Sequence, residues 1–274
     1  MIVDTHTHLF SDDRSRFPLS PGTYEPATGG SAELLREDML SAGADRAVVI
    51  SPYFYRWDNR YVMDCWDRFG DWLAVVVLVD PRAADGPETL RRLVAEGASG
   101  LRIHGDINRL GPYDDPTQTP LWMAAADLNI AFDACAALEE YPEIEKRARE
   151  FPSLRIILDH CGYIGGKWNP PRVDLEPVLA MAKYPNVYAK LTFLGSVPDS
   201  PWPHANAHWM VRRVIQAFGP ERCMWGSNFP TRQYNPTATY VQHLDALRTH
   251  MELTPQEREL VLGGTALTLW KWKT

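Results

Sequence analysis

The sequence predicts a single (β/α)8 barrel over residues 1–274. Eight short β-rich runs alternate with segments of helical periodicity, which is the pattern of a parallel barrel. The runs are nearly continuously apolar, as expected for parallel strands that are covered on both faces. One barrel needs roughly 250 residues, so the length of 274 residues fits a single domain. A doubly wound open sheet is the alternative arrangement of the same elements.

Short apolar runs place the predicted strands in chain order. They are residues 2–8 (IVDTHTH), 46–51 (RAVVIS), 72–80 (WLAVVVLVD), 100–104 (GLRIH), 130–135 (IAFDAC), 154–160 (LRIILDH), 186–191 (NVYAKL) and 222–227 (RCMWGS). The segments between them have the amphipathic spacing of helices. In the first, SAELLREDMLSAG, Ser31 is the predicted N-cap and Gly43 is predicted to end the helix.

Several segments that follow the strands are long and rich in Gly, Pro and aromatic residues. In a barrel these loops open on one face, where they form the walls of a site. We expect Tyr53, Trp168 and Trp202 to line an apolar pocket there. The alternative is that such side chains simply cover the barrel mouth.

Composition limits the classes of partner. The net charge of −7 and the lack of a long basic run argue against a nucleic-acid partner. The four cysteines are widely spaced without a CxxC pair, which indicates a reducing compartment. No signal peptide and no apolar stretch of membrane-spanning length is recognised. We therefore expect a cytoplasmic protein with a small-molecule partner, and homo-oligomerisation is left open.

Two histidines on the first strand are the strongest sign of chemistry. His6 and His8 are two residues apart, and alternation along a strand puts both on one face, with Asp4 deeper in the same row. Two imidazoles at one point form a metal site or an acid/base pair. His204 and His208 are four apart but lack the Glu of an HExxH motif, so they are expected to be solvated or to pack against a loop.

Other polar residues lie at predicted strand ends. Arg102 and His104 share a face, where Arg102 offers a fork for a substrate carboxylate and His104 a donor or acid. Equally, Arg102 could bridge to a neighbouring acid. Asp133 is the carboxylate best placed to move a proton, unless Arg102 or Lys190 binds it inside the barrel. Asp159 is expected to point toward the helix layer.

Four motifs together resemble the amidohydrolase superfamily, in particular its amidohydrolase-2 branch of lactonases, decarboxylases and hydratases. They are MIVDTHTHLF, LDHCGY, NVYAKL and MWGSNFP, in that order along nearly the whole chain. The resemblance implies two histidines on strand 1, one each on strands 5 and 6, and an aspartate on strand 8, as metal ligands or substrate-binding groups. His6, His8 and His160 match three of these positions. Lys190 resembles a lysine of lactonase-like relatives and is expected to hold a substrate carboxylate or an alkoxide.

Two positions depart from the family pattern. Cys135 stands where the strand 5 histidine is expected, and Asn228 stands where the strand 8 aspartate is expected. A carboxamide has no basic oxygen, so Asn228 cannot be the general base. His6, His8 and His160 could still hold Zn²⁺ with Cys135 as a thiolate ligand. We favour a site without metal, in which Cys135 contacts substrate; Cys135 as a covalent nucleophile is a lesser alternative.

These expectations predict a hydrolase or isomerase of a lactone or related cyclic carboxylic acid derivative. His6, His8 and His160 are expected to polarise the carbonyl, with Asn228 donating a hydrogen bond and Asp133 or a histidine moving the proton. A second hypothesis is a Zn²⁺- or Mn²⁺-dependent non-oxidative decarboxylase or hydratase of an aromatic or enoic acid. A third is a barrel that binds a ligand without catalysis.

Overall fold

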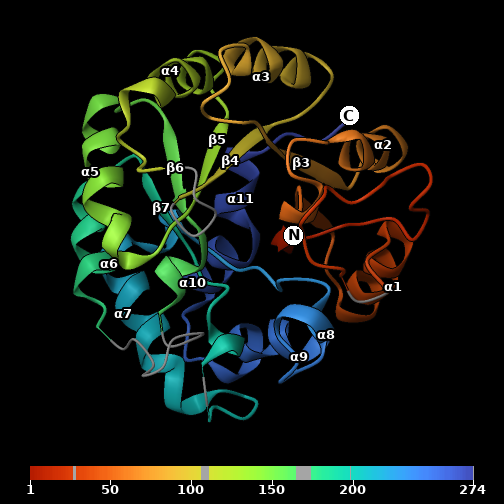
Figure 1. Ribbon diagram of the computed structural model, residues 1–274. Helices are drawn as coiled ribbons and strands as arrows, with labels where there is room; N and C mark the ends of the chain where they lie inside the picture. Colours follow the sequence, from red (N-terminus) through yellow and green to blue (C-terminus); the bar gives the residue numbers. More distant parts are fainter. Residues whose placement is uncertain (27–28, 106–110, 165–173, 198, 274) are drawn as a thin grey trace.

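Eight parallel strands form the centre of the molecule, with helices outside them (Figure 1). The computed structural model describes residues 1–26, 29–105, 111–164, 174–197 and 199–273. The strands pair in chain order and are β1 (Val3–Thr7), β2 (Arg46–Ile50), β3 (Leu73–Leu78), β4 (Gly100–His104), β5 (Ala131–Cys135), β6 (Arg155–Leu158), β7 (Val187–Lys190) and β8 (Cys223–Met224). This is the predicted (β/α)8 barrel.

The residues after β8 close the barrel against β1. The amide of Thr5 donates to the carbonyl of Trp225 at 3.1 Å, and the amide of His8 donates to the carbonyl of Phe229 at 2.8 Å. β8 is thus shorter than the predicted 222–227, because its chain continues as an irregular segment that still bonds to β1. This irregular segment contains Asn228.

Helices surround the strands in Figure 1. They are α1 (Ala32–Ala42), α2 (Arg60–Phe69), α3 (Gly86–Ala95), α4 (Thr119–Asp127), α5 (Tyr141–Glu150), α6 (Glu176–Ala180), α7 (His208–Phe218), α8 (Thr231–Tyr234), α9 (Tyr240–Asp245), α10 (Pro255–Glu259) and α11 (Thr265–Leu269). The predicted limits of α1 are confirmed, since the Ser31 hydroxyl accepts from the Leu34 amide and Gly43 has φ 77°. The segments that form α2, α8, α10 and α11 were not singled out as helices from the sequence.

An apolar layer fills the part of the barrel interior that lies away from the carboxyl ends of the strands. Side chains of the strands, including Val48, Val76 and Ile157, pack with Leu269 and Trp270 at the end of α11. The polar residues of the interior lie beyond this layer, toward the carboxyl ends of the strands. Among the described residues, no helix has the length and apolar character needed to cross a membrane.

Candidate active site

Three histidines meet at the carboxyl ends of β1 and β6. His6 lies within β1 and His8 immediately follows it, and their ring centroids are 4.9 Å apart. The ring of His160 is centred 4.5 Å from that of His6. All three residues are buried. The rings therefore converge as the sequence leads one to expect, while their chemical roles remain predictions.

A tight turn after β6 delivers both His160 and its neighbour Asp159. β6 ends at Leu158, and His160, Cys161 and Gly162 then have φ values of 55°, 46° and 67°. Because strand alternation stops at Leu158, the carboxylate of Asp159 enters the barrel centre. The expectation that Asp159 points toward the helix layer was wrong. The sequence signal that could have found it is an acid directly before a site histidine, at a strand end.

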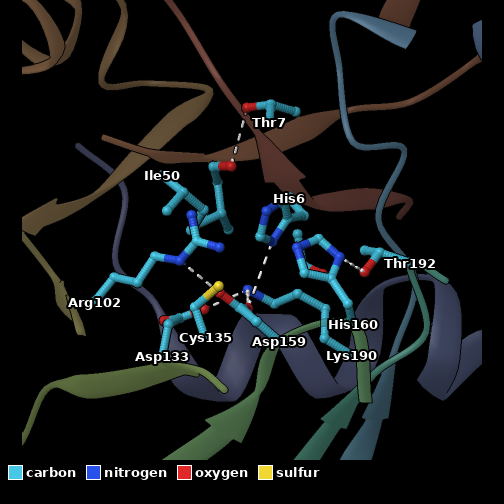
Figure 2. Close-up of polar contacts among 12 residues, drawn as sticks. His6, Thr7, Ile50, Arg102, Asp133, Cys135, Asp159, His160, Lys190 and Thr192 are labelled. Atoms are coloured by element: carbon cyan, nitrogen blue, oxygen red, sulfur yellow. Dashed lines mark hydrogen bonds and ion pairs between the residues drawn. The ribbon is translucent and has the colours of Figure 1, made fainter. Parts of the chain in front are cut away.

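Asp159 is the hub of a buried group of charges (Figure 2). Its Oδ2 lies 2.8 Å from Nε of Arg102, and its Oδ1 lies 2.9 Å from Nζ of Lys190. Oδ1 is also 3.5 Å from Nδ1 of His6. Lys190 in turn donates to Asp133. Two cations and two carboxylates thus neutralise one another beneath the histidines.

This network pairs three residues whose predicted roles involve a substrate or a proton. Lys190 is fully buried, its Nζ pairs with Asp133 and Asp159, and Nζ lies 5.6 Å from the centre of the Trp270 ring. Its role in holding a substrate carboxylate or alkoxide stays a prediction. Asp133 is bound by Lys190, which was the alternative to its role in moving a proton. Nε of Arg102 is committed to Asp159 rather than to a substrate acid. Arg102 and Lys190 therefore set the charge of the site from below.

Burial determines the protonation of the cluster. Burial lowers the pKa of His6 to about 3 and lowers the pKa of His8 and His104 well below the usual value. Burial alone would raise the pKa of Asp159, but the charges of Lys190 and Arg102 hold that pKa well below its usual range. Hence His6, His8 and His104 are neutral at pH 7 and Asp159 is ionised.

Buried ring nitrogens of a neutral histidine need hydrogen-bond partners, and His6 and His104 have nitrogens without one among the described residues. Neither ring nitrogen of His6 has a hydrogen-bond partner within the described residues, and neither does Nε2 of His104. His8 differs, because its Nδ1 lies 3.0 Å from the carbonyl oxygen of Ile50. His160 Nδ1 lies 2.5 Å from the Thr192 hydroxyl. Buried unpaired nitrogens mark the place where a substrate would supply the missing bonds.

A second buried acid fixes the segment that carries Asn228. Asp4 accepts from the amide and the hydroxyl of Ser227, at 2.9 and 2.6 Å. The amide of Asn228 donates to the carbonyl of His6 at 2.9 Å, and Asn228 has φ 61°. Burial raises the pKa of Asp4 to about 6. Asp4 therefore links β1 to the segment after β8. The sequence placed Asp4 on the same face as His6 and His8 but did not predict this link.

The group of side chains that could hold a metal ion differs from the expected one. Donor atoms of His6, Asp159 and His160 lie within 4.8 Å of one another, whereas His8 and Cys135 do not belong to this group. Cys135 Sγ lies 3.1 Å from the Tyr163 hydroxyl, and burial raises the pKa of the Cys135 thiol. Cys135 is thus replaced by Asp159 in the possible ligand set.

The aromatic residues expected to line a pocket separate in the structure. The Tyr53 ring is centred 5.3 Å from the ring of His104, at the edge of the site. The indole of Trp202 instead donates to the carbonyl of Gln242 in α9, at 3.1 Å, and its ring contacts His250. Trp202 therefore packs on the outer helical layer, which corrects its expected place. Trp168 lies outside the described residues.

The pair His204 and His208 packs against its own loop, one of the two expectations for it. His204 Nδ1 lies 2.6 Å from the carbonyl of Ser200, and His208 Nε2 lies 2.7 Å from the carbonyl of Pro203. Both histidines hold the loop that precedes α7.

The barrel with histidines at the ends of its strands defines an amidohydrolase. The sequence model of the family described as amidohydrolase matches residues 3–272, and the chain belongs to this family. A relative named L-fucono-1,5-lactonase, from Burkholderia ambifaria, is 30% identical over 98% of this chain and 95% of its own length. One named D-galactarolactone isomerase, from Agrobacterium fabrum, is 26% identical over 87% and 79%.

Solved structures give the same fold. An amidohydrolase from Burkholderia multivorans with bound zinc superposes with a TM-score of 0.74, at 19% identity, and the match covers 98% of both chains. At this identity the likeness concerns the fold alone.

Proposed function

We propose that the protein opens lactones by adding water across the acyl carbon–oxygen bond, without a metal ion. The convergence of His6, His8 and His160 above a neutralised charge cluster is the observation that carries the proposal. The names of the two relatives, a lactonase and a lactone isomerase, supply the substrate class. An isomerase would use the same geometry, with a substrate hydroxyl in place of water.

The partner of His8 gives that histidine a role. A carbonyl oxygen only accepts, so Nδ1 of His8 carries the proton that it donates to Ile50. Neutral His8 therefore keeps a lone pair on Nε2, and its lowered pKa leaves that lone pair available at neutral pH. We assign His8 Nε2 as the acceptor of a proton from the attacking water. It returns that proton to the ring oxygen as the acyl carbon–oxygen bond breaks, which yields a hydroxy acid.

The carbonyl oxygen needs donors as it becomes an oxyanion. Nε2 of His6 lacks a hydrogen-bond partner in the described part of the chain. Neutral His6 has one N–H, and the tautomer with its proton on Nε2 would present that N–H to the oxygen. The Asn228 carboxamide is the second proposed donor, and His160 remains a predicted third. A fixed donor commonly contributes about 3 to 4 kcal/mol to transition-state stabilisation.

The donor set fits a divalent cation poorly. An ion bound by His6, Asp159 and His160 would lie next to the positive charges of Arg102 and Lys190, which already occupy both oxygens of Asp159. The strand 8 position offers Asn228, whose amide oxygen is a weaker ligand than a carboxylate. The charges in this chain therefore suit a developing oxyanion better than a metal ion.

Proton release from a panel of sugar and muconate-type lactones tests this function. His8→Asn keeps a nitrogen able to donate to Ile50 but removes the basic Nε2, so we expect kcat to fall about 100-fold or more. His208→Gln, at the start of α7 and outside the site, is the matched control and should retain activity. No opening of any lactone by the wild type, or full activity in His8→Asn, would contradict the proposal.

We also propose a cytoplasmic location. The support is that Cys65, Cys135, Cys161 and Cys223 are all buried and unbridged. Unpaired cysteines are typical of reducing compartments.

A further inference from the structure

We propose that Arg56, at the rim of the histidine cluster, binds a carboxylate on the substrate and so makes the enzyme selective for acidic lactones. This inference rests on the proposed lactone-opening function and deepens it. Arg102 and Lys190, the residues expected to hold an acid, are both bound to Asp159 inside the barrel. A cation outside this buried group of charges is therefore a candidate for binding a substrate carboxylate.

Arg56 follows the short helical turn Tyr53–Tyr55 in the loop after β2. Its guanidinium carbon lies 5.5 Å from the centre of the Tyr53 ring. The Tyr53 ring in turn is centred 5.3 Å from that of His104, the last residue of β4. His104 lies two residues after Arg102 on β4, so both side chains are on the same face of the strand, beside the central cluster. Arg56, Tyr53 and His104 thus form one continuous wall of the site.

The guanidinium of Arg56 is available for a ligand. Nε of Arg56 is buried and has no hydrogen-bond partner among the described residues, and none of their carboxylates lies within 4.0 Å of it. Two other arginines differ: Arg60 pairs with Asp58 at 2.6 Å, and Arg16 pairs with Asp64 at 2.6 Å. A partly buried guanidinium without an acid is the arrangement that binds a carboxylate with two parallel hydrogen bonds.

The backbone of Arg56 supports a functional role. Its φ of 47° lies in the left-handed region that favours glycine, and its amide donates to the carbonyl of Tyr53 at 2.8 Å. This conformation holds the side chain over Tyr53. His104 Nε2, buried and without a hydrogen-bond partner in the described ranges, offers a neutral group beside it for the substrate. The pair would receive the end of the substrate farthest from the reacting carbonyl.

Two lactones that differ at one group test this proposal. D-galactaro-1,4-lactone carries a carboxylate where D-galactono-1,4-lactone carries a hydroxymethyl group. We expect the wild type to prefer the acid, and Arg56→Gln to lower the acid-over-neutral ratio of kcat/KM about 10- to 100-fold, mainly through KM. Arg56→Lys should recover part of the preference. Arg60→Gln is the control, because it removes an exposed arginine at the start of α2 that already has an acidic partner.

Calorimetric binding of the open-chain acids galactarate and galactonate separates this inference from the proposed function. If the wild type binds galactarate more tightly than galactonate and Arg56→Gln does not, the inference is supported, whether or not any lactone is opened. If no lactone is opened, only the lactonase proposal is overturned. An equal preference in wild type and Arg56→Gln, or no preference in the wild type, overturns the role of Arg56. A Gln or Lys side chain at φ 47° strains the backbone as much as Arg does. Thermal unfolding should therefore show that Arg56→Gln and Arg56→Lys are folded.

Discussion

Asp159 Oδ2 lies 2.8 Å from Arg102 Nε in the centre of the barrel, with both side chains buried. The same carboxylate bonds Lys190 at 2.9 Å, so one anion stands between two cations. Both cations therefore have an anionic partner inside the barrel. Substitution of Asp159 should therefore lower the stability of the protein.

Replacing Asp159 by Asn should destabilise the protein strongly. The variant leaves Arg102 and Lys190 buried with Asp133 as their remaining acid, and an uncompensated buried charge costs about 3 to 5 kcal/mol. Urea unfolding measures the loss. Asp114→Asn, which breaks the surface pair with Lys146, is the control and should unfold like the wild type. Equal stability of Asp159→Asn and wild type would show that the Asp159 carboxylate does not stabilise the buried cations.

Loss of the Asn228 carboxamide should reduce kcat by roughly a hundredfold or more, because a fixed donor to the oxyanion disappears. Alanine at φ 61° would also strain the backbone, so Asn228→Gly is the informative companion of Asn228→Ala. Steady-state kinetics on an opened lactone should show the same fall in both. Undiminished kcat in Asn228→Gly would exclude the side chain from the mechanism.

Asp4→Asn should loosen the loop that carries Asn228. The amide in place of the carboxylate cannot accept from both the Ser227 amide and its hydroxyl in the present geometry. We expect a loss of about 1 to 3 kcal/mol in unfolding free energy and a lower kcat with KM less affected. A variant that loses stability while keeping kcat would show that Asp4 serves the fold without positioning Asn228.

Stability should fall as the pH drops from 7 toward 5. The folded pKa of His6, His8 and His104 lies below the unfolded value of about 6.5. Between those values the unfolded chain binds more protons, so stability is lost as the pH falls through 6.5. Asp4 and Asp133, with pKa raised to about 6 and about 7, act in the opposite direction but are fewer. Urea midpoints measured across this range check the sign, and a midpoint that rises toward pH 5 would contradict it.

Regular periodicity made much of the molecule predictable. The strand order and the meeting of His6 and His8 follow from alternation along apolar strands. The limits of α1 follow from the Ser31 cap and Gly43. These features depend on local sequence and on the fixed geometry of a parallel barrel.

What escaped prediction depends on irregular backbone and on long-range pairing. Asp159 enters the site because β6 ends at Leu158, two residues before the predicted end, and the chain then turns with positive φ from His160 onward, which alternation cannot foresee. The role of Lys190 was predicted from the resemblance to lactonase-like relatives, and its contact with Asp159 could not be foreseen, because Asp159 is brought to it by the turn after β6. The sequence did not point to Arg56. Its proposed role depends on the lack of an acidic partner within the described residues, and this property is visible only in the folded chain.

Lactone turnover by protein of known metal content tests the central claim most directly. Metal should be measured by elemental analysis before and after dialysis against a chelator, with kcat measured on the same samples. We expect full activity with far less than one zinc or manganese per chain. Activity that disappears on chelation and returns in proportion to added zinc or manganese would contradict a mechanism built on neutral histidines.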